Sequence, residues 1–122
     1  MSTITAIRTI SITVADQAAA VDFYTDTLGF DVRLDAAIGP DLRWIEIAPA
    51  GADVSLALDR GIVNGPADSG VRFTVPDAEV EHAALAALGV AVGEVLRWEG
   101  VPAMFTFDDP DGNRFYVVED RS

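Results

Sequence analysis

The sequence contains no cysteine and no lysine, and His82 is its single histidine. Without cysteine the chain can form no disulfide, no thiolate nucleophile and no zinc–sulfur site. Without lysine it can form no Schiff base through a lysine amine. One histidine cannot supply the two or three imidazole ligands of a histidine metal site within one chain. Several large classes of enzyme chemistry are therefore excluded.

Long apolar runs are also missing. None reaches the roughly 18 residues of a membrane helix, and residues 1–10 lack the apolar centre and cleavage site of a signal peptide, so we expect a cytoplasmic protein. The formal net charge of −12 disfavours nucleic acid as a partner, because phosphate backbones are repelled. That charge could attract a cationic ligand, although a role in solubility is the simpler interpretation. With 122 residues, half of them apolar, one domain with its own core is expected.

The sequence repeats itself at an offset of about 61 residues. Residues 12–16 (ITVAD) and 28–30 (LGF) match residues 73–77 (FTVPD) and 88–90 (LGV). In each copy an alternating strand runs into an aspartate that can cap a helix, and a glycine ends that helix. The repeat predicts two copies of one βαβββ module.

The modules are expected at about 4–58 and 70–119, joined by a linker at 59–69 that is rich in turn residues. Apolar and polar residues alternate along the strands, which predicts a helix-covered apolar face and a free mixed face. We expect helices at 16–28 and 77–88, and strands at 5–14, 30–38, 42–48, 53–58, 70–75, 91–97, 101–108 and 113–119.

The pattern resembles the vicinal oxygen chelate superfamily, which includes glyoxalase I, extradiol dioxygenases, fosfomycin-resistance enzymes and bleomycin-resistance proteins. The residues that carry the resemblance are 13–16 (TVAD), 20–24 (AVDFY), 28–30 (LGF) and 109–113 (DPDGN). The resemblance implies an α+β fold with 1–122 as a single domain. Its two modules would form a curved, U-shaped mixed sheet with the helices on the outer face.

Metal enzymes of this superfamily place four ligands in the cavity of the sheet. The resemblance assigns those positions to Thr9, Ser55 or a neighbour, Gly70 and Tyr116. None is a good ligand for a divalent cation, which prefers imidazole or carboxylate. We therefore expect a metal-free member that has no cofactor.

Aromatic, hydroxyl and charged residues at cavity-side positions are the candidate ligand-binding residues. The tryptophans could stack on a planar ligand, or could pack in the core or a dimer interface. Arg72 and Arg114 could pair with a ligand carboxylate or with the chain's own carboxylates. The complete candidate set is Thr9, Ser11, Arg43, Trp44, Glu46, Ser55, Arg72, Trp98, Met104 and Tyr116.

Two residues are weak catalytic candidates. Tyr116 could donate a hydrogen bond or act as an acid, or could simply fill a vacant metal position. Glu46 could act as a base if burial beside Trp44 raised its pKa, although placement at the surface or a strand edge is favoured. His82 is expected at the surface, because the helical pattern places it away from the apolar position of Val80.

Two details of the second half concern the strand 101–108 and the turn that follows it. Three carboxylates, Asp108, Asp109 and Asp111, are best interpreted as turn residues. Either Met104 or the pair of phenylalanines, at 105 and 107, must face the core, and the pattern leaves both choices open.

Three functions are compatible with these features. The first is a metal-independent binding protein that sequesters an antibiotic or metabolite, as bleomycin-resistance proteins sequester a cationic drug in a groove between two subunits. Residues 98–103 (WEGVPA) depart from the motif expected there, so the ligand is expected to be another planar, aromatic or cationic molecule. The second is a lyase, isomerase or dioxygenase, metal-independent or with a displaced metal. The third is an interaction module. The resemblance also implies a homodimer.

Overall fold

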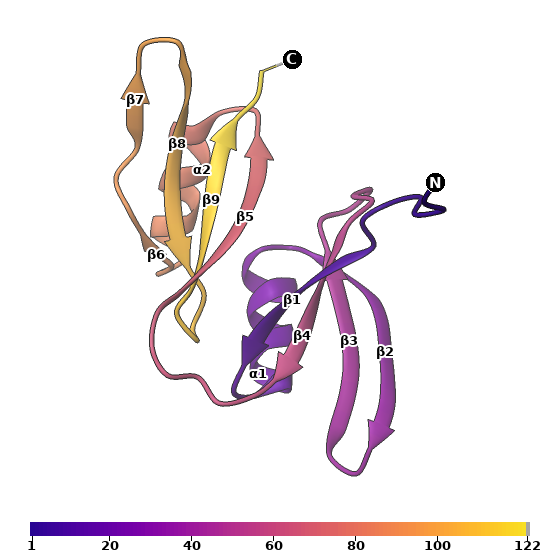
Figure 1. The fold of residues 1–122 in the computed structure, drawn as a ribbon. Coiled ribbons are helices and arrows are strands. Elements are labelled where there is room, and N and C mark those ends of the chain that lie inside the picture. The colour runs from indigo at the N-terminus through magenta and orange to yellow at the C-terminus, as the bar shows by residue number, and fades with distance from the viewer. Residues whose placement is uncertain (122) are drawn as a thin grey trace. The chain divides into compact units, whose positions relative to one another are not determined.

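The computed structural model describes residues 1–121, which form two compact units divided between Val63 and Asn64 (Figure 1). Each unit contains one mixed sheet and one helical segment, and the strands of each unit pair only within that unit. The expected α+β class with two similar βαβββ modules is confirmed. No helix among residues 1–121 is long and apolar enough to span a membrane.

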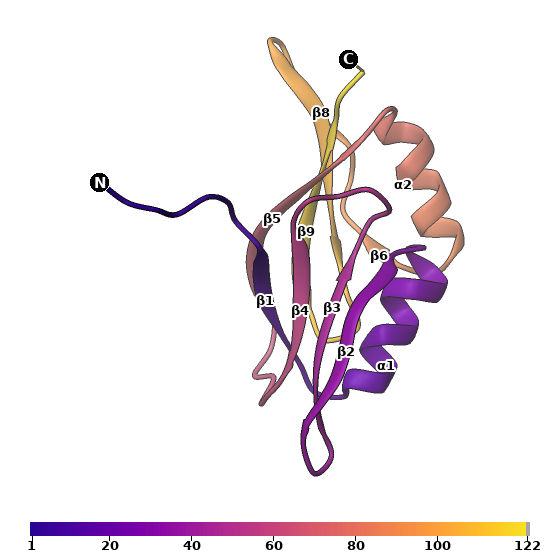
Figure 2. The same ribbon diagram turned by 90° about the vertical axis from the view of Figure 1, so that its right-hand side faces the viewer.

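The first unit has the sheet order β1-β4-β3-β2, in which β1 is parallel to β4 and the other pairs are antiparallel. One face is covered by α1 and a π-helical turn, η1, that continues it (Figure 2). The other face has no helix within the unit, and we call it the helix-free face. The elements are β1 (Thr9–Val14), α1 (Gln17–Asp22), η1 (Phe23–Thr27), β2 (Asp31–Gly39), β3 (Leu42–Ala48) and β4 (Ser55–Arg60).

The second unit repeats this connectivity. Its sheet order is β5-β9-β8-β6, with β7 also paired to β8, and β5 runs parallel to β9. Helix α2 lies against one face of the sheet and leaves the other helix-free (Figure 2). The elements are β5 (Ala67–Val75), α2 (Ala78–Ala87), β6 (Ala91–Val92), β7 (Leu96–Trp98), β8 (Val101–Asp108) and β9 (Asn113–Glu119).

The predicted helix boundaries follow from local chemistry that the structure confirms. Asp16 caps α1 by accepting a hydrogen bond from the backbone N–H of Ala19 at 3.0 Å, and Asp77 caps α2 in the same way. After the helical segments, Gly29 and Gly89 have φ values of +74° and +82°, which side-chain-bearing residues rarely adopt. The repeat in sequence is therefore a repeat in structure.

Three boundaries differ from prediction. Residues 5–8 are not in a strand, because β4 begins only at Ser55, which pairs with Thr9. The predicted strand 91–97 is divided into β6 and β7 around Gly93, where an added Cβ would lie 2.7 Å from the hydroxyl oxygen of Thr106. The predicted linker is shorter than expected, since β4 extends to Arg60 and β5 begins at Ala67.

Strand β8 resolves the open choice between Met104 and the phenylalanines. Phe105 and Phe107 are 1% and 2% exposed and belong to the core beneath α2, whereas Met104 is half-buried on the helix-free face. The ring of Phe107 stacks at 5.3 Å on that of Phe115 in β9. The alternation predicted for these strands is therefore confirmed.

The expected position of His82 is wrong. Its side chain is half-buried, its Nε2 lies 2.9 Å from the carbonyl oxygen of Gly93, and its ring meets Phe105 edge-on. Val80, which the helical pattern places in the apolar stripe, is 66% exposed. Helix α2 buries Ala78 and Leu85 instead. The helix is therefore rotated about its axis relative to the predicted orientation, and His82 faces the sheet.

Candidate functional site

A hydrogen-bonded group of side chains lies on the helix-free face of the first unit. The carboxylate of Glu46 accepts hydrogen bonds from the indole Nε1 of Trp44 at 2.8 Å and from the hydroxyl of Ser55 at 2.7 Å. Arg8 donates to it at 3.3 Å. The hydroxyl of Ser55 is also 2.9 Å from that of Thr9. We call these five residues the Glu46 cluster.

Strand register explains why these residues meet. Thr9 of β1 is paired with Ser55 of β4, so their side chains share one face of the sheet. Glu46 of β3 is paired with Ala57, two residues along β4 from Ser55, which places the carboxylate on the same face. Trp44 precedes Glu46 by two residues and therefore also shares that face. Alternation along three strands is enough to assemble the cluster.

The expected surface placement of Glu46 is wrong, because this residue is 4% exposed. The predicted direction of its pKa shift is also wrong. Hydrogen bonds from Trp44 and Ser55 lower the pKa of Glu46, and the charge of Arg8 adds to them, whereas burial opposes them. The ionised carboxylate is stabilised, so Glu46 is a weaker proton acceptor than an ordinary carboxylate.

This shift predicts how folding stability depends on pH. Because the pKa of Glu46 is lowered in the folded protein, its contribution is fully present above the ordinary glutamate pKa and is lost as pH falls through the folded-state value. Glu46→Gln should therefore reduce the loss of unfolding free energy at acidic pH. Urea unfolding of both proteins across that range measures the difference. Parallel stability curves would contradict this assignment.

The residues present do not fit a metal centre. At two positions to which the family resemblance assigns ligands, Thr9 and Ser55 carry neutral hydroxyls that already bond to each other. Glu46 is the one carboxylate of the cluster, and its oxygens already accept three hydrogen bonds. Among residues 1–121, no three histidine, cysteine or acidic side chains come together in a way that could hold a metal ion.

A second group of side chains lies on the helix-free face of the second unit. The hydroxyl of Tyr116 donates to Asp68 at 2.6 Å, and the guanidinium of Arg72 stacks 4.4 Å from the centre of the Tyr116 ring. The backbone N–H of Gly70 also donates to Asp68. The hydrogen bond to Asp68 raises the pKa of Tyr116, with burial as the next cause. Tyr116 therefore holds its proton more firmly than a free tyrosine.

Tyr116→Phe should raise the pKa of Asp68 toward its ordinary value, because the hydrogen bond from Tyr116 is the largest cause of the lowered pKa of Asp68. Carbon-13 NMR titration of the aspartate carboxyl signals measures the change. Arg72→Gln is the control, since the charge of Arg72 is a smaller cause and its removal should raise this pKa less. A larger rise in the pKa of Asp68 in Arg72→Gln than in Tyr116→Phe would contradict the hydrogen bond from Tyr116 as its main cause.

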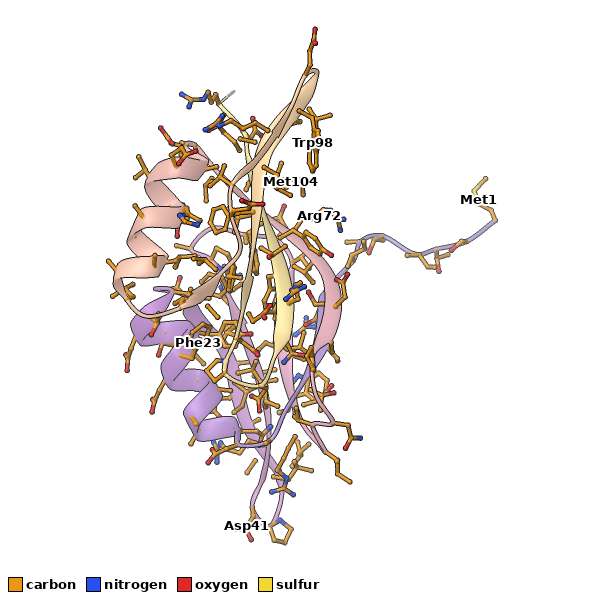
Figure 3. The ribbon with its side chains drawn as sticks, turned by 90° about the vertical axis from the view of Figure 1, so that its left-hand side faces the viewer. Met1, Phe23, Asp41, Arg72, Trp98 and Met104 are labelled. Atoms are coloured by element: carbon orange, nitrogen blue, oxygen red, sulfur yellow. The ribbon has the colours of Figure 1, made fainter. Side chains whose placement is uncertain are left out.

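The remaining predicted residues are not part of either group. Arg43 lies on the α1 side of its sheet, where its guanidinium pairs with Asp35. Ser11 is exposed on the helix-free face. Figure 3 shows Trp98 and Met104 on the side of the second sheet that is turned away from α2. Trp98 is 54% exposed there, in contrast to the half-buried Trp44.

The carboxylates near the last turn have structural partners. Asp109 is 5% exposed, and its Oδ1 accepts hydrogen bonds from the backbone N–H groups of Asp111 and Asn113. Asp108 pairs with Arg114 at 2.9 Å. The assignment of Asp109 and Asp111 to the turn is thus confirmed, whereas Asp108 is the last residue of β8 and not a turn residue. Arg114 pairs with one of the chain's own carboxylates.

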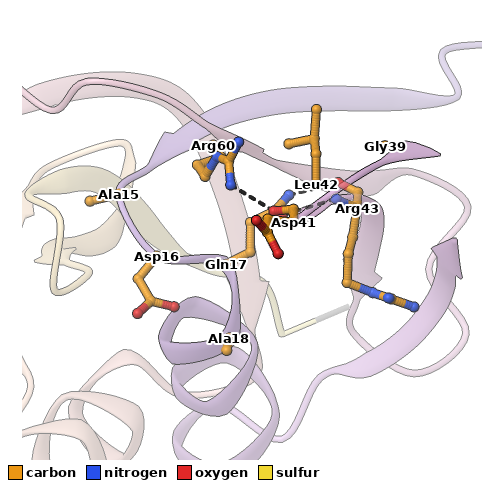
Figure 4. Close-up of a pocket in the computed structure, with 9 residues that line it drawn as sticks. All are labelled: Ala15, Asp16, Gln17, Ala18, Gly39, Asp41, Leu42, Arg43 and Arg60. Atoms are coloured by element: carbon orange, nitrogen blue, oxygen red, sulfur yellow. Dashed lines mark hydrogen bonds between the residues drawn. The ribbon is translucent and has the colours of Figure 1, made fainter. Parts of the chain in front are cut away.

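A pocket of about 550 Å³ lies elsewhere in the first unit, between the start of α1 and the β2–β3 turn (Figure 4). Arg60 lines it and donates to the backbone carbonyl of Asp41 at 2.6 Å. The amide of Gln17 forms part of the wall and is bonded to backbone atoms of Arg43 and Leu58. The pocket contains no member of the Glu46 cluster, and of its polar side chains Gln17 connects α1 to the sheet.

Sequence reasoning misses two members of these groups, Arg8 and Asp68. Alternation along the predicted strand 5–14 would place Arg8 on the face opposite Thr9, whereas β1 begins at Thr9 and leaves Arg8 outside any strand. Asp68 falls in the predicted linker, whereas the structure places it in β5 beside a bulge opposite β9. A charged residue directly next to a candidate position is a signal that could have found Arg8, whereas Asp68 is adjacent to no candidate residue.

Comparisons with known proteins give a consistent result. The family model of the glyoxalase/bleomycin resistance protein/dioxygenase superfamily matches residues 6–117. The uncharacterized protein YetH of Bacillus subtilis (strain 168) is 31% identical over 117 residues, which cover 93% of this chain and 97% of YetH.

Two crystal structures extend the comparison. A superfamily member from Sphaerobacter thermophilus DSM 20745 is 30% identical with a TM-score of 0.88, covering 96% of this chain and 98% of its own. TnmS3, an antibiotic binding protein from Streptomyces sp. CB03234, is 34% identical with a TM-score of 0.83, covering 98% of both chains. The chain therefore belongs to the glyoxalase/bleomycin resistance protein/dioxygenase superfamily.

Proposed function

We propose that this protein is a metal-independent small-molecule binding protein of the glyoxalase/bleomycin-resistance type, with its ligand held against the helix-free faces of its sheets. The observation that carries the proposal is the Glu46 cluster. At positions where the resemblance assigns metal ligands, this chain has the hydroxyls of Thr9 and Ser55, both engaged with each other and one of them with a buried carboxylate. The similarity to TnmS3, described as antibiotic binding, supports a binding role.

Trp44 indicates the kind of ligand. Its indole N–H is fixed by the carboxylate of Glu46 at 2.8 Å, and the residue is only half-buried. An aromatic ring fixed before binding loses little conformational freedom when a ligand stacks on it. We therefore propose a planar aromatic ligand, and sequestration of an antibiotic or metabolite as the biological role.

The alternative of a lyase or isomerase has less support. Such an enzyme would need a group that exchanges a proton near neutral pH. The pKa of Tyr116 is raised by Asp68, and the pKa of Glu46 is lowered by Trp44 and Ser55, so both shifts move away from neutrality. These directions favour binding over acid–base catalysis.

Thermal unfolding in the presence of planar aromatic compounds tests the proposal. A ligand at 100 times its dissociation constant adds about 2.7 kcal/mol to the unfolding free energy, which raises the melting temperature by several degrees. We expect stabilisation in EDTA, retained in Trp98→Phe and reduced in Trp44→Phe. Stabilisation that requires Mn²⁺ or Zn²⁺ would contradict metal independence. Turnover of the stabilising compound would favour the enzyme alternative.

We also propose that the protein is a homodimer. Apolar side chains are exposed on strands that lie at sheet edges or pair only with β8: Val32 and Ile38 of β2 are 45% and 57% exposed, and Trp98 of β7 is 54% exposed. Such positions favour contact with another chain. Light scattering should give twice the monomer mass of 12.9 kDa. A monomer mass at micromolar concentration would contradict the proposal.

A further inference from the structure

Arg8 is the exposed member of the Glu46 cluster. Its side chain is 74% exposed, whereas the side chain of Glu46 that it contacts is 5% exposed. A guanidinium group has five N–H donors. Within residues 1–121 the side chain of Arg8 donates one hydrogen bond, from Nη2 to Oε2 of Glu46. Most of its donors therefore face solvent.

The contact between the exposed Arg8 and the buried Glu46 is not fully explained by neutralisation of the carboxylate. Glu46 already accepts hydrogen bonds from Trp44 at 2.8 Å and Ser55 at 2.7 Å, both shorter than the 3.3 Å contact with Arg8. Those two neutral donors lower the pKa of Glu46 more than Arg8 does. The lowered pKa of Glu46 is therefore due mainly to Trp44 and Ser55, with Arg8 as a smaller cause.

Two contacts fix the position of Arg8. The backbone N–H of Ser55 donates to the carbonyl oxygen of Arg8 at 3.1 Å, which anchors its main chain beside β4. At the other end, Nη2 of Arg8 and Nε1 of Trp44 both donate to the same oxygen, Oε2 of Glu46. The indole and the guanidinium consequently lie next to each other, held by one buried carboxylate.

We infer that Arg8 and Trp44 form a recognition site for a planar aromatic ligand that carries a carboxylate or another acidic group. The ring stacks on Trp44, and the acidic group pairs with the free donors of Arg8. Glu46 acts as a positioning residue for both. This inference rests on the proposed function and names the ligand class of that site. It differs from the expectation based on the net charge of −12, which disfavours anions overall.

Two probes of the same shape, 2-naphthoate and 2-naphthamide, separate the local from the overall charge effect. In a Trp98→Phe background, Trp44 gives the single indole N–H signal, and its NMR titration yields a dissociation constant for each probe. We expect naphthoate to bind about tenfold more tightly than naphthamide. The overall charge alone would produce the opposite order.

Variants of two arginines test whether Arg8 causes the preference for naphthoate over naphthamide. Arg8→Gln should reduce the naphthoate-to-naphthamide ratio to about one, and Arg8→Lys should restore part of it, because lysine keeps the charge without the bidentate fork. Arg33→Gln is the matched control. Arg33 belongs to the same unit but donates to the carbonyls of Pro49 and Ala52, so its removal changes the net charge equally and should leave the ratio unchanged.

The outcomes distinguish this inference from the proposed function. If naphthamide binds as tightly as naphthoate, or if Arg8→Gln leaves the preference intact, the role of Arg8 is wrong while aromatic binding at Trp44 stands. If neither probe at millimolar concentration shifts the Trp44 signal, both the inference and the proposed site are overturned. Equal losses of preference in Arg8→Gln and Arg33→Gln would show that the loss follows the change in net charge and not the position of Arg8, which would overturn the role of Arg8.

Discussion

Replacing Glu46 by alanine is expected to lower the free energy of unfolding by about 2–3 kcal/mol. The change removes the acceptor for Trp44 and Ser55 and leaves the buried hydroxyl of Ser55 without its shortest hydrogen bond, at 2.7 Å. The larger loss seen when a fully buried ion pair is broken is not expected, because Arg8 is 74% exposed and water can solvate its charge. Urea unfolding measures the difference.

Glu46→Gln is the matched control for this substitution. The amide oxygen can still accept from Trp44 and Arg8, which donate to the same oxygen of Glu46, and the amide N–H can donate to the hydroxyl of Ser55. The main loss is therefore the negative charge that faces Arg8. The stability loss should be about 1 kcal/mol. The indole N–H signal of Trp44 should move less in Glu46→Gln than in Glu46→Ala. A fully stable alanine variant would show that the cluster does not hold its members in place.

Replacing Phe105 by alanine is expected to destabilise the protein by about 3–5 kcal/mol, the range typical of truncating a buried aromatic side chain. Phe105 is 1% exposed, and its ring meets the ring of His82 edge-on with centroids 5.2 Å apart. The cavity left between β8 and α2 cannot collapse easily, because the strand is paired on both sides. Denaturant unfolding gives the magnitude.

The neighbouring residue in β8 supplies the control. Met104 points to the helix-free face and is half-buried, so Met104→Ala should lose only about 1 kcal/mol. The two residues are adjacent in sequence and both apolar, and therefore differ mainly in the face of the sheet that they occupy. Similar losses for both variants, or a larger loss for Met104→Ala, would contradict the assignment of faces.

Much of the fold is predictable because the same signals for the start and end of a helix occur in both halves of the repeat. Helix caps at Asp16 and Asp77 and glycines at 29 and 89 mark the same boundaries in both halves, and each depends on local chemistry alone. Strand alternation also predicts which residues share a face. The rotation of α2 is not predictable from these signals, because Val80 and Leu88 are apolar yet exposed.

The candidate site was partly predictable for the same reason. Thr9, Trp44, Glu46 and Ser55 share one face by alternation, and in the structure their side chains are in contact. The burial of Glu46 could not be predicted, because it depends on hydrogen bonds from three separate segments of the chain. The contact of Arg8 with Glu46 could not be predicted either, because Arg8 is expected within a strand, whereas the structure begins β1 at Thr9.

The central claim is that the helix-free face of the first unit, built around Glu46 rather than around an ion, binds an aromatic ligand without metal. Titration calorimetry of 2-naphthoate tests it most directly, using protein stripped with EDTA and the same protein with excess Mn²⁺ or Zn²⁺. Equal dissociation constants in the presence and absence of metal are the predicted result. Binding that is lost in EDTA and restored by the metal would contradict the claim.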